Sequence, residues 1–244
     1  MLILAFFRDI IWIMYYYLVS PIKIVRSDAS SFTYSSEERL PTGTIVEIEI
    51  GKAKNIGIVL QEVRRPDFEV KAIIKIIEKY PLPIELVQTA AWMSKYYATH
   101  QATVWQTILP SGLSKKRRNL NLSTSVISPQ KRIKNVFTTE QQTALQTIDN
   151  LHSGTVLLHG VTGSGKTLVY IEAVERALKE ELSSIILVPE IALTSQLVAE
   201  FSTHFPNVIV THSKQTEAQR HAAWRKIISS NDPVVVIGPR SALF

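Results

Sequence analysis

The sequence contains no cysteine, and this absence excludes two kinds of site. Neither a disulfide nor a cysteine-ligated zinc ion can form within these 244 residues. A chain without cysteine is compatible with a cytoplasmic protein, and we expect that location. Six histidines are present but none forms an H-x-x-x-H pair, so we expect surface or core histidines rather than metal ligands.

A long hydrophobic run is also missing. Residues 1–19 are strongly apolar, but Arg8 and Asp9 interrupt them and leave residues 10–19 as the longest charge-free apolar stretch. That stretch has about half the length that a helix needs to cross a bilayer. No small-residue cleavage site follows it. We therefore predict no membrane span, a buried strand that begins near Met14, and an upstream extension over residues 1–13.

Acidic residues are missing from one internal segment. The net charge is +6, yet residues 1–113 carry 12 basic and 11 acidic residues, and residues 136–244 carry 8 and 10. The other 7 basic residues lie in the segment 114–135, which has no acid. Because this segment also lacks periodicity, we predict a basic linker and a domain boundary over residues 114–136. Such a run is commonly a solvated face, and contact with a polyanion is the alternative.

Short runs rich in branched residues predict strands in the first half of the chain. These runs cover residues 22–25, 44–50, 55–60 and 72–77. Strands this short favour a small barrel or sandwich. One amphipathic helix is predicted over residues 83–99, and we expect its Trp92, Tyr96 and Tyr97 to pack rather than to stack on nucleic-acid bases. This mainly-β domain, with one or two helices, is placed at residues 14–113.

Residues 160–167 carry the strongest motif in the chain. They read Gly-Val-Thr-Gly-Ser-Gly-Lys-Thr and fit G-x-x-x-x-G-K-[ST], the phosphate-binding loop of nucleoside triphosphatases. The apolar residues 155–158 predict a strand before the loop, and residues 168–179 predict a helix after it. Glycines let backbone N–H groups surround phosphate oxygens, and the helix N-terminus adds partial positive charge. Lys166 would reach the β- and γ-phosphates, and the Thr167 hydroxyl would hold Mg²⁺.

Helices and strands alternate over residues 137–244. We predict helices at residues 140–150, 166–181, 191–204 and 215–229, and strands at residues 155–158, 185–188, 208–210 and 233–237. This alternation is typical of a doubly wound α/β domain with a mostly parallel sheet. Ligands then bind at the carboxyl ends of the strands, where the phosphate loop lies.

Further motifs point to one family. Residues 187–194 read Leu-Val-Pro-Glu-Ile-Ala-Leu-Thr, and residues 238–244 read Gly-Pro-Arg-Ser-Ala-Leu-Phe. The first half contributes Phe32-Thr33-Tyr34 and Leu-Pro-Ser-Gly-Leu at residues 109–113. Together with the phosphate loop, these motifs resemble the N-terminal part of the PriA family, the primosomal helicases of bacterial replication restart. The resemblance covers nearly the whole chain from Met14.

The resemblance implies a superfamily 2 DNA helicase that moves 3′ to 5′ and uses ATP and Mg²⁺. It implies that a domain binding the 3′ end of a DNA strand precedes the first P-loop (RecA-like) lobe. Forked and single-stranded DNA, primosome proteins and single-strand-binding protein are the implied partners. Zinc is implied only for a C-terminal part beyond Phe244.

The resemblance also assigns roles to residues. Gln141 would contact adenine. The residues that would hold the phosphates and Mg²⁺ are Gly160, Thr162, Gly163, Ser164, Gly165, Lys166 and Thr167. The implied DNA contacts are Phe32, Thr33, Tyr34 and Lys71 in the first domain, and Pro189, Glu190, Thr194, Arg240 and Ser241 in the second. We expect the linker residues to make further contacts with the DNA backbone; these residues are Lys115, Lys116, Arg117 and Arg118.

Four features depart from the family pattern. Leu168 stands where the family usually has a glutamate after the phosphate loop, and we expect little effect from this change. Thr33 stands where the family has an aspartate that could accept a hydrogen bond from a terminal 3′-hydroxyl. The 23 residues from Ser114 to Val136 are too few for the family's winged-helix domain, since independent domains have about 50 residues or more. The sequence stops at Phe244, before the acidic motif, the second lobe and the zinc-binding cysteines. We therefore expect this chain to bind ATP but to hydrolyse it barely or not at all.

Two other functions are compatible with parts of the sequence. The first is a non-catalytic adaptor that binds forked DNA, in which nucleotide binds without turnover. The second is another P-loop motor or a nucleotide kinase. The sequence argues against a kinase, because nothing resembles a lid for a second substrate and the segment after Pro189 has no role in one.

Overall fold

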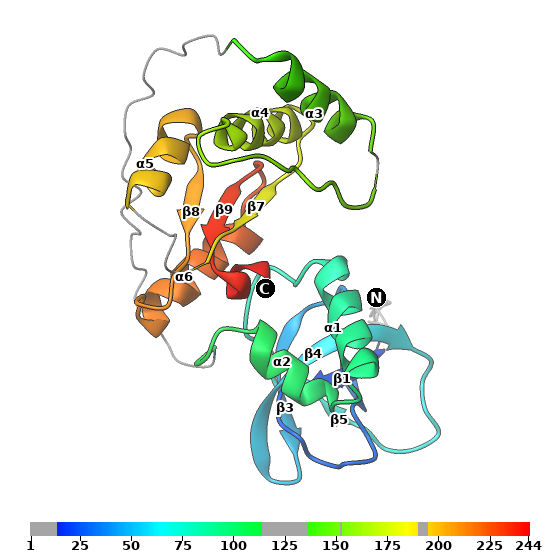
Figure 1. The fold of residues 1–244 in the computed structure, drawn as a ribbon. Coiled ribbons are helices and arrows are strands. Elements are labelled where there is room, and N and C mark those ends of the chain that lie inside the picture. The colour runs from blue at the N-terminus through cyan, green and yellow to red at the C-terminus, as the bar shows by residue number, and fades with distance from the viewer. Residues whose placement is uncertain (1–13, 114–135, 152, 190–194) are drawn as a thin grey trace, which may run out of the picture. The chain divides into compact units, whose positions relative to one another are not determined.

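The structure is a computed structural model that describes residues 14–113, 136–151, 153–189 and 195–244 (Figure 1). The chain divides into one unit over Met1–Lys116 and a second over Arg117–Leu243. Within the described residues, no helix has the combination of length and apolar character that a membrane crossing requires.

The first unit is built on one mixed sheet in which most neighbouring strands are antiparallel. Its strands are β1 (Tyr15–Pro21), β2 (Phe32–Ser36), β3 (Ile45–Ile50), β4 (Ala53–Val63), β5 (Lys71–Ala72) and β6 (Lys75–Ile76). They lie in the order β5-β2-β1-β4-β3-β6, so β5 and β6 form the two edges. The start of β1 agrees with the strand predicted near Met14.

The two edges of this sheet are joined by consecutive residues. The Ile73 amide donates to the Ser35 carbonyl at 2.8 Å, and the Ile74 amide donates to the Glu47 carbonyl at 2.9 Å. Ser35 belongs to β2 and Glu47 belongs to β3, on opposite sides of the sheet. Neighbouring Cα atoms are only about 3.8 Å apart, so the sheet must curl until its edges meet. The sequence predicts a small barrel or sandwich, and the curled sheet with its joined edges corresponds to the barrel.

The barrel interior explains which strand predictions hold. Residues 44–50 and 55–60 were predicted as strands and lie in β3 and β4, whose Val46, Ile48 and Val59 are buried with Tyr17. The strand predicted at residues 22–25 is wrong, since the strand lies earlier, in β1. Ile24 is 56% exposed, so this branched residue has the composition typical of a strand but is not buried in the core.

Two helices follow the barrel. The predicted helix 83–99 is confirmed as α1 (Ile84–Tyr96), whereas α2 (Gln101–Ile108) lies beyond it, in residues to which the sequence analysis assigned no helix. A new helix starts because the His100 Nδ1 accepts from the Ala102 amide at 3.1 Å and so caps α2. Trp105 of α2 is fully buried, and its indole N–H donates to the Ser20 hydroxyl at 3.0 Å.

The aromatic residues of α1 correct another expectation. Trp92, Tyr96 and Tyr97 are 56%, 67% and 62% exposed, and the rings of Trp92 and Tyr96 stack with centroids 4.8 Å apart. They therefore contact each other and do not pack into the interior of the unit. The buried face of α1 carries Val87 and Ala90, and the helical period turns the aromatic residues away from that face.

The second unit is an α/β domain. Its elements are α3 (Thr139–Asp149), α4 (Lys166–Lys179), β7 (Ser184–Leu187), α5 (Ser195–His204), β8 (Val208–Val210), α6 (Glu217–Ile228), β9 (Val235–Gly238) and a 3₁₀ helix, η2 (Arg240–Leu243). The described strands form a parallel sheet in the order β7-β9-β8. The predicted helices and the last three predicted strands are confirmed to within a few residues, although the residues before Ser195 in helix 191–204 lie outside the described part.

Helices cover both faces of this sheet. Ile171 of α4 and Phe201 of α5 are buried against Ile237 of β9. On the opposite face, Ala223 of α6 is buried with Ile209 and Val236. Burial on both faces by crossover helices is the doubly wound arrangement that the sequence predicts.

One predicted strand is wrong. Residues 155–158 form no strand, and Leu157 is 88% exposed. No described strand pairs with this segment, and β7 has only β9 beside it. An apolar run is suited to a buried strand, but the strand exists only where another chain segment bonds its backbone groups.

Candidate nucleotide and DNA sites

The phosphate loop begins at Gly160 and leads into the first turn of α4. Gly163 and Gly165 have φ angles of +81° and +78°, in the left-handed region that favours glycine. Gly165 is the N-cap residue of α4, and a Cβ atom there would meet the side-chain amide nitrogen of Gln141 at 2.4 Å. The backbone of the loop therefore explains the glycine at both positions, of which the motif itself fixes Gly165.

Lys166 lies over the loop. Its ammonium group donates to the carbonyl oxygens of Gly160 at 2.6 Å and Val161 at 2.8 Å. Thr167 is the next residue of the same turn, and both are half-buried. The N-terminal N–H groups of a helix have no partner within the helix, so this turn offers backbone donors, an ammonium ion and a hydroxyl to an anion. No cluster of three or more His, Asp or Glu residues suited to a metal occurs among the described residues.

Gln141 is brought to the loop by α3. Thr138 caps this helix, and the Gln141 side-chain oxygen accepts from the Thr138 amide at 3.0 Å. The Gln141 amide nitrogen donates to the Ser164 carbonyl at 3.1 Å. A primary amide has two N–H groups and two oxygen lone pairs, so one donor and one acceptor remain for a ligand.

The structure also brings together two of the predicted DNA-contact segments. Pro189 lies two residues after the end of β7, and Arg240 and Ser241 begin η2 two residues after the end of β9; all three are exposed. The ends of β7 and β9 are adjacent, since the Val188 amide donates to the Gly238 carbonyl at 2.9 Å. One carboxyl edge of the sheet thus presents a guanidinium and a hydroxyl. Glu190 and Thr194 lie outside the described residues, as do Lys115, Lys116, Arg117 and Arg118.

In the first unit, the Phe32-Thr33-Tyr34 motif forms β2, and Lys71 of β5 pairs with Tyr34. Tyr34 is buried, and its hydroxyl donates to the Glu49 carbonyl at 3.1 Å. Burial raises the pKa of Tyr34 above its usual value, and the Glu49 carboxylate adds to this effect. Tyr34 is therefore a neutral donor that supports β3, and it does not face solvent.

Two residues that the sequence analysis missed surround Lys71. Its ammonium donates to the Glu49 carboxylate at 2.5 Å and to the Gly51 carbonyl at 2.6 Å. Glu49 and Gly51 lie about twenty residues before Lys71, at the end of β3 and in the turn after it. The turn at Gly51 was predictable, but the approach of β5 to it depends on the curled sheet.

The two units match two different family models. Residues 25–110 match the model of the PriA 3′ DNA-binding domain, and residues 138–244 match the model of the DEAD/DEAH box helicase. The matched ranges lie almost wholly within the described parts of the first and second units.

Several curated relatives align with this chain, two of them over most of its length and one over less than half. The replication restart protein PriA of Helicobacter pylori (strain ATCC 700392 / 26695) is 34% identical over 235 residues, which cover 95% of this chain and 35% of the relative. That of Rickettsia prowazekii (strain Madrid E) is 31% identical over 222 residues, covering 87% and 33%. That of Bacillus subtilis (strain 168) is 41% identical over 113 residues, covering 44% and 14%.

The chain spans about a third of the length of the relatives that match most of it. Its two matched models occur in the order 3′ DNA-binding domain, then helicase domain. The resemblance seen in the motifs is thus supported over 95% of this chain by its alignment with 35% of a replication restart protein. This chain belongs to the PriA family.

Proposed function

We propose that this chain supplies the ATP-binding lobe and the DNA-end-binding domain of a 3′-to-5′ helicase of replication restart. The observation that carries the proposal is the phosphate loop at the start of α4, with Gln141 of α3 bonded to Ser164 of that loop at 3.1 Å. The match of the other unit to a 3′ DNA-binding domain supports the role in DNA.

The proposed nucleotide site uses both helices. Gly160, Thr162, Gly163, Ser164 and Gly165 would surround the phosphates with backbone N–H groups, and α4 would contribute the ammonium and hydroxyl of its first turn. Mg²⁺, when bound, would neutralise the phosphate charge, and Thr167 is the residue that would hold it.

Gln141 is suited to adenine. Its remaining donor and acceptor match the N7 acceptor and N6 donor on one edge of that base, whereas guanine offers two acceptors there. The proposed site therefore favours ATP over GTP. The second unit would then act as a first RecA-like lobe, with the DNA backbone at Pro189, Glu190, Thr194, Arg240 and Ser241. The linker residues 115–118 would add positive charge to the same backbone.

The proposed 3′-end site lies at Lys71. Its ammonium has three N–H groups, two of which are used by Glu49 and Gly51. The second oxygen of the Glu49 carboxylate and the third N–H of Lys71 then form an acceptor beside a donor. A hydroxyl group, which both donates and accepts, complements this pair. Glu49 would thus supply the carboxylate that Thr33 does not.

The 3′-end site predicts selectivity among DNA ends. We expect single strands with a 3′-hydroxyl to bind more tightly than the same strands with a 3′-phosphate, because the phosphate carries only acceptors and is repelled by Glu49. Glu49→Gln should reduce this preference by about tenfold, since a charged hydrogen bond contributes about 1.5–3 kcal/mol. Fluorescence anisotropy of labelled oligonucleotides measures both affinities.

The matched control is Glu47→Gln. Glu47 lies on the same strand, but it pairs with Lys75 at 3.1 Å and Lys54 at 3.7 Å instead of Lys71. The control should leave the preference between ends unchanged. If Glu49→Gln binds both ends as the parent chain does, Glu49 has no part in recognising the end.

In the whole protein, primosome proteins and single-strand-binding protein are the partners that this function requires, and the cytoplasm is where it would act. Forked DNA is the proposed substrate. DNA-stimulated ATP hydrolysis, measured with the Lys166 variant described below, would exclude the non-catalytic adaptor.

A further inference from the structure

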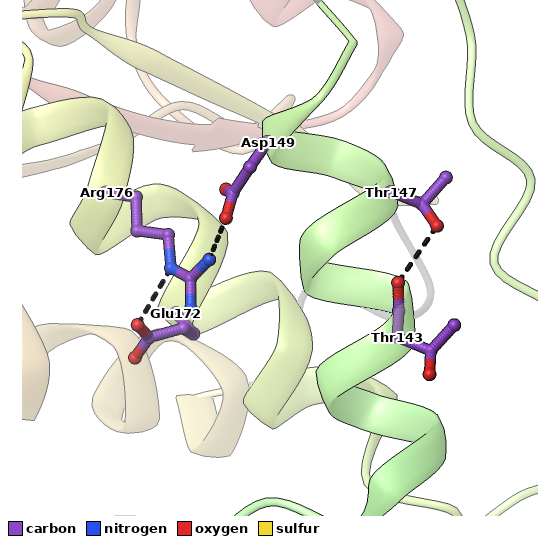
Figure 2. Close-up of polar contacts among 5 residues, drawn as sticks. All are labelled: Thr143, Thr147, Asp149, Glu172 and Arg176. Carbon is purple, nitrogen blue, oxygen red and sulfur yellow. Dashed lines mark hydrogen bonds and ion pairs between the residues drawn. The ribbon is translucent and has the colours of Figure 1, made fainter.

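α3 has few apolar contacts that could fix its position. Leu145 is its one buried residue, and the side chains on its outer face are largely threonine and glutamine. Thr143 and Thr147 belong to that face, and the Thr147 hydroxyl donates to the Thr143 carbonyl of the same helix at 2.9 Å (Figure 2). One buried leucine contributes about 1.5–3 kcal/mol, and an 11-residue helix is marginal alone. Polar anchors must therefore contribute to the placement of α3.

Two polar anchors connect α3 to the phosphate loop and its helix. At the first turn of α3, Gln141 bonds to Ser164 of the loop. At the last turn, Asp149 accepts a hydrogen bond from Arg176, which comes from α4 (Figure 2). Since α4 also begins with Lys166, the same helix carries the phosphate-binding end and the anchor for the far end of α3.

Arg176 is held in place for this contact. Its Nε donates to the Glu172 carboxylate one turn earlier at 3.0 Å, while its Nη1 reaches Asp149 (Figure 2). The side chain is 34% exposed, and Glu172 is 21% exposed. A guanidinium that bonds two carboxylates in a fixed direction loses less side-chain entropy per bond than an isolated surface pair.

We propose that Arg176 is a positioning residue for the nucleotide base: through Asp149 it holds α3 at the angle that keeps Gln141 against the phosphate loop. This inference rests on the proposed adenine contact of Gln141. It separates the site into two parts. The loop and Lys166 bind phosphate without help from α3, and the Arg176–Asp149 bond is needed only for recognising the base.

The test compares three ligands on the 244-residue chain. ATP reports the base and phosphate contacts together, GTP reports the choice of base, and inorganic tripolyphosphate reports the phosphate loop alone. We expect Arg176→Ala to weaken ATP binding about fivefold to tenfold and to reduce the ratio of ATP affinity to GTP affinity by a similar factor. The reason is that the side-chain amide of Gln141 would lose its hydrogen bonds to the base. The affinity for tripolyphosphate should not change. Competition against a fluorescent nucleotide gives all three constants.

Asp149→Asn provides an independent variant from the other helix. It keeps the shape of the side chain and removes the charge that Arg176 bonds. The same selective loss is expected, and combining it with Arg176→Ala should add little, because residues that act through one bond are not additive. Lys179→Ala is the matched control, since Lys179 pairs with Glu175 of α4 itself at 3.2 Å. This control should bind all three ligands as the parent chain does.

Each outcome bears on the inference. An equal loss of ATP and tripolyphosphate would mean that Arg176 only stabilises the fold, and the inference would be wrong. Unchanged ATP-over-GTP ratios in both variants would also overturn it. A parent chain that binds tripolyphosphate without preferring ATP to GTP would overturn the adenine contact of Gln141, and with it this role of Arg176. A parent chain that binds none of the three would overturn the proposed function first.

Discussion

Replacing Lys166 by alanine is expected to abolish nucleotide binding by the 244-residue chain. The Lys166 ammonium already bonds two carbonyl oxygens of the loop, at 2.6 and 2.8 Å, and would reach the β- and γ-phosphates from there. Hydrogen bonds to charged groups contribute about 1.5–3 kcal/mol each. Losing the bonds from Lys166 to the β- and γ-phosphates should therefore weaken ATP binding by about 100-fold or more. Titration with a fluorescent ATP analogue measures this loss.

Lys214→Ala is the control for charge, because Lys214 is an exposed lysine of the same unit outside the proposed sites. It should bind ATP as the parent chain does. If Lys166→Ala keeps more than a tenth of the parent affinity, residues 160–167 are not the phosphate site.

The parent chain and Lys166→Ala also test whether this chain hydrolyses ATP. We expect ATP to bind with little turnover, because the sequence up to Phe244 does not include the acidic motif that the family resemblance implies for hydrolysis. ATP hydrolysis is measured with and without forked DNA. DNA-stimulated hydrolysis that disappears in Lys166→Ala would contradict this expectation and show a complete motor. Nucleotide and DNA binding without hydrolysis is the behaviour of an adaptor or of part of a motor.

Replacing Trp105 by alanine is expected to destabilise the first unit strongly. Trp105 is fully buried in α2, and its indole N–H bonds the Ser20 hydroxyl of β1 at 3.0 Å. Removing a buried tryptophan costs about 3–5 kcal/mol, which is much of the about 5–15 kcal/mol that stabilises a typical domain. The thermal midpoint of this unit should fall by roughly 15 °C or more.

Thermal unfolding followed by tryptophan fluorescence measures this shift, and Trp92→Ala is its control. Trp92 has the same side chain on the neighbouring helix but is 56% exposed, so its loss should move the midpoint by only a few degrees. Nucleotide affinity should be unchanged in both variants, because the phosphate loop belongs to the second unit. A parallel loss of ATP binding in Trp105→Ala would show that the two units do not fold independently.

Local chemistry determined much of what the sequence could predict. The phosphate loop was predictable because its glycines, lysine and threonine act within eight consecutive residues, and the left-handed φ angles at Gly163 and Gly165 require that residue type. The helices at residues 140–150 and 166–181 were predictable because their caps and apolar spacing lie within each helix. The parallel α/β order followed from the alternation of these elements.

Tertiary structure alone decided which segments meet. Residues 155–158 have the composition of a strand, but no described strand bonds them, whereas residues 184–187 have β9 as a partner. Burial of Trp105 and exposure of Trp92 depend on which face of each helix meets the barrel, which the residue type does not encode.

The same reason explains the residues that the sequence did not reveal. Glu49 reaches Lys71 because the sheet curls, and Arg176 reaches Asp149 because α3 lies beside α4. Both contacts join residues more than twenty positions apart. Motifs near the phosphate loop could therefore be assigned from spacing. The contacts proposed to act at a DNA end and to position α3 depend instead on how distant segments pack together.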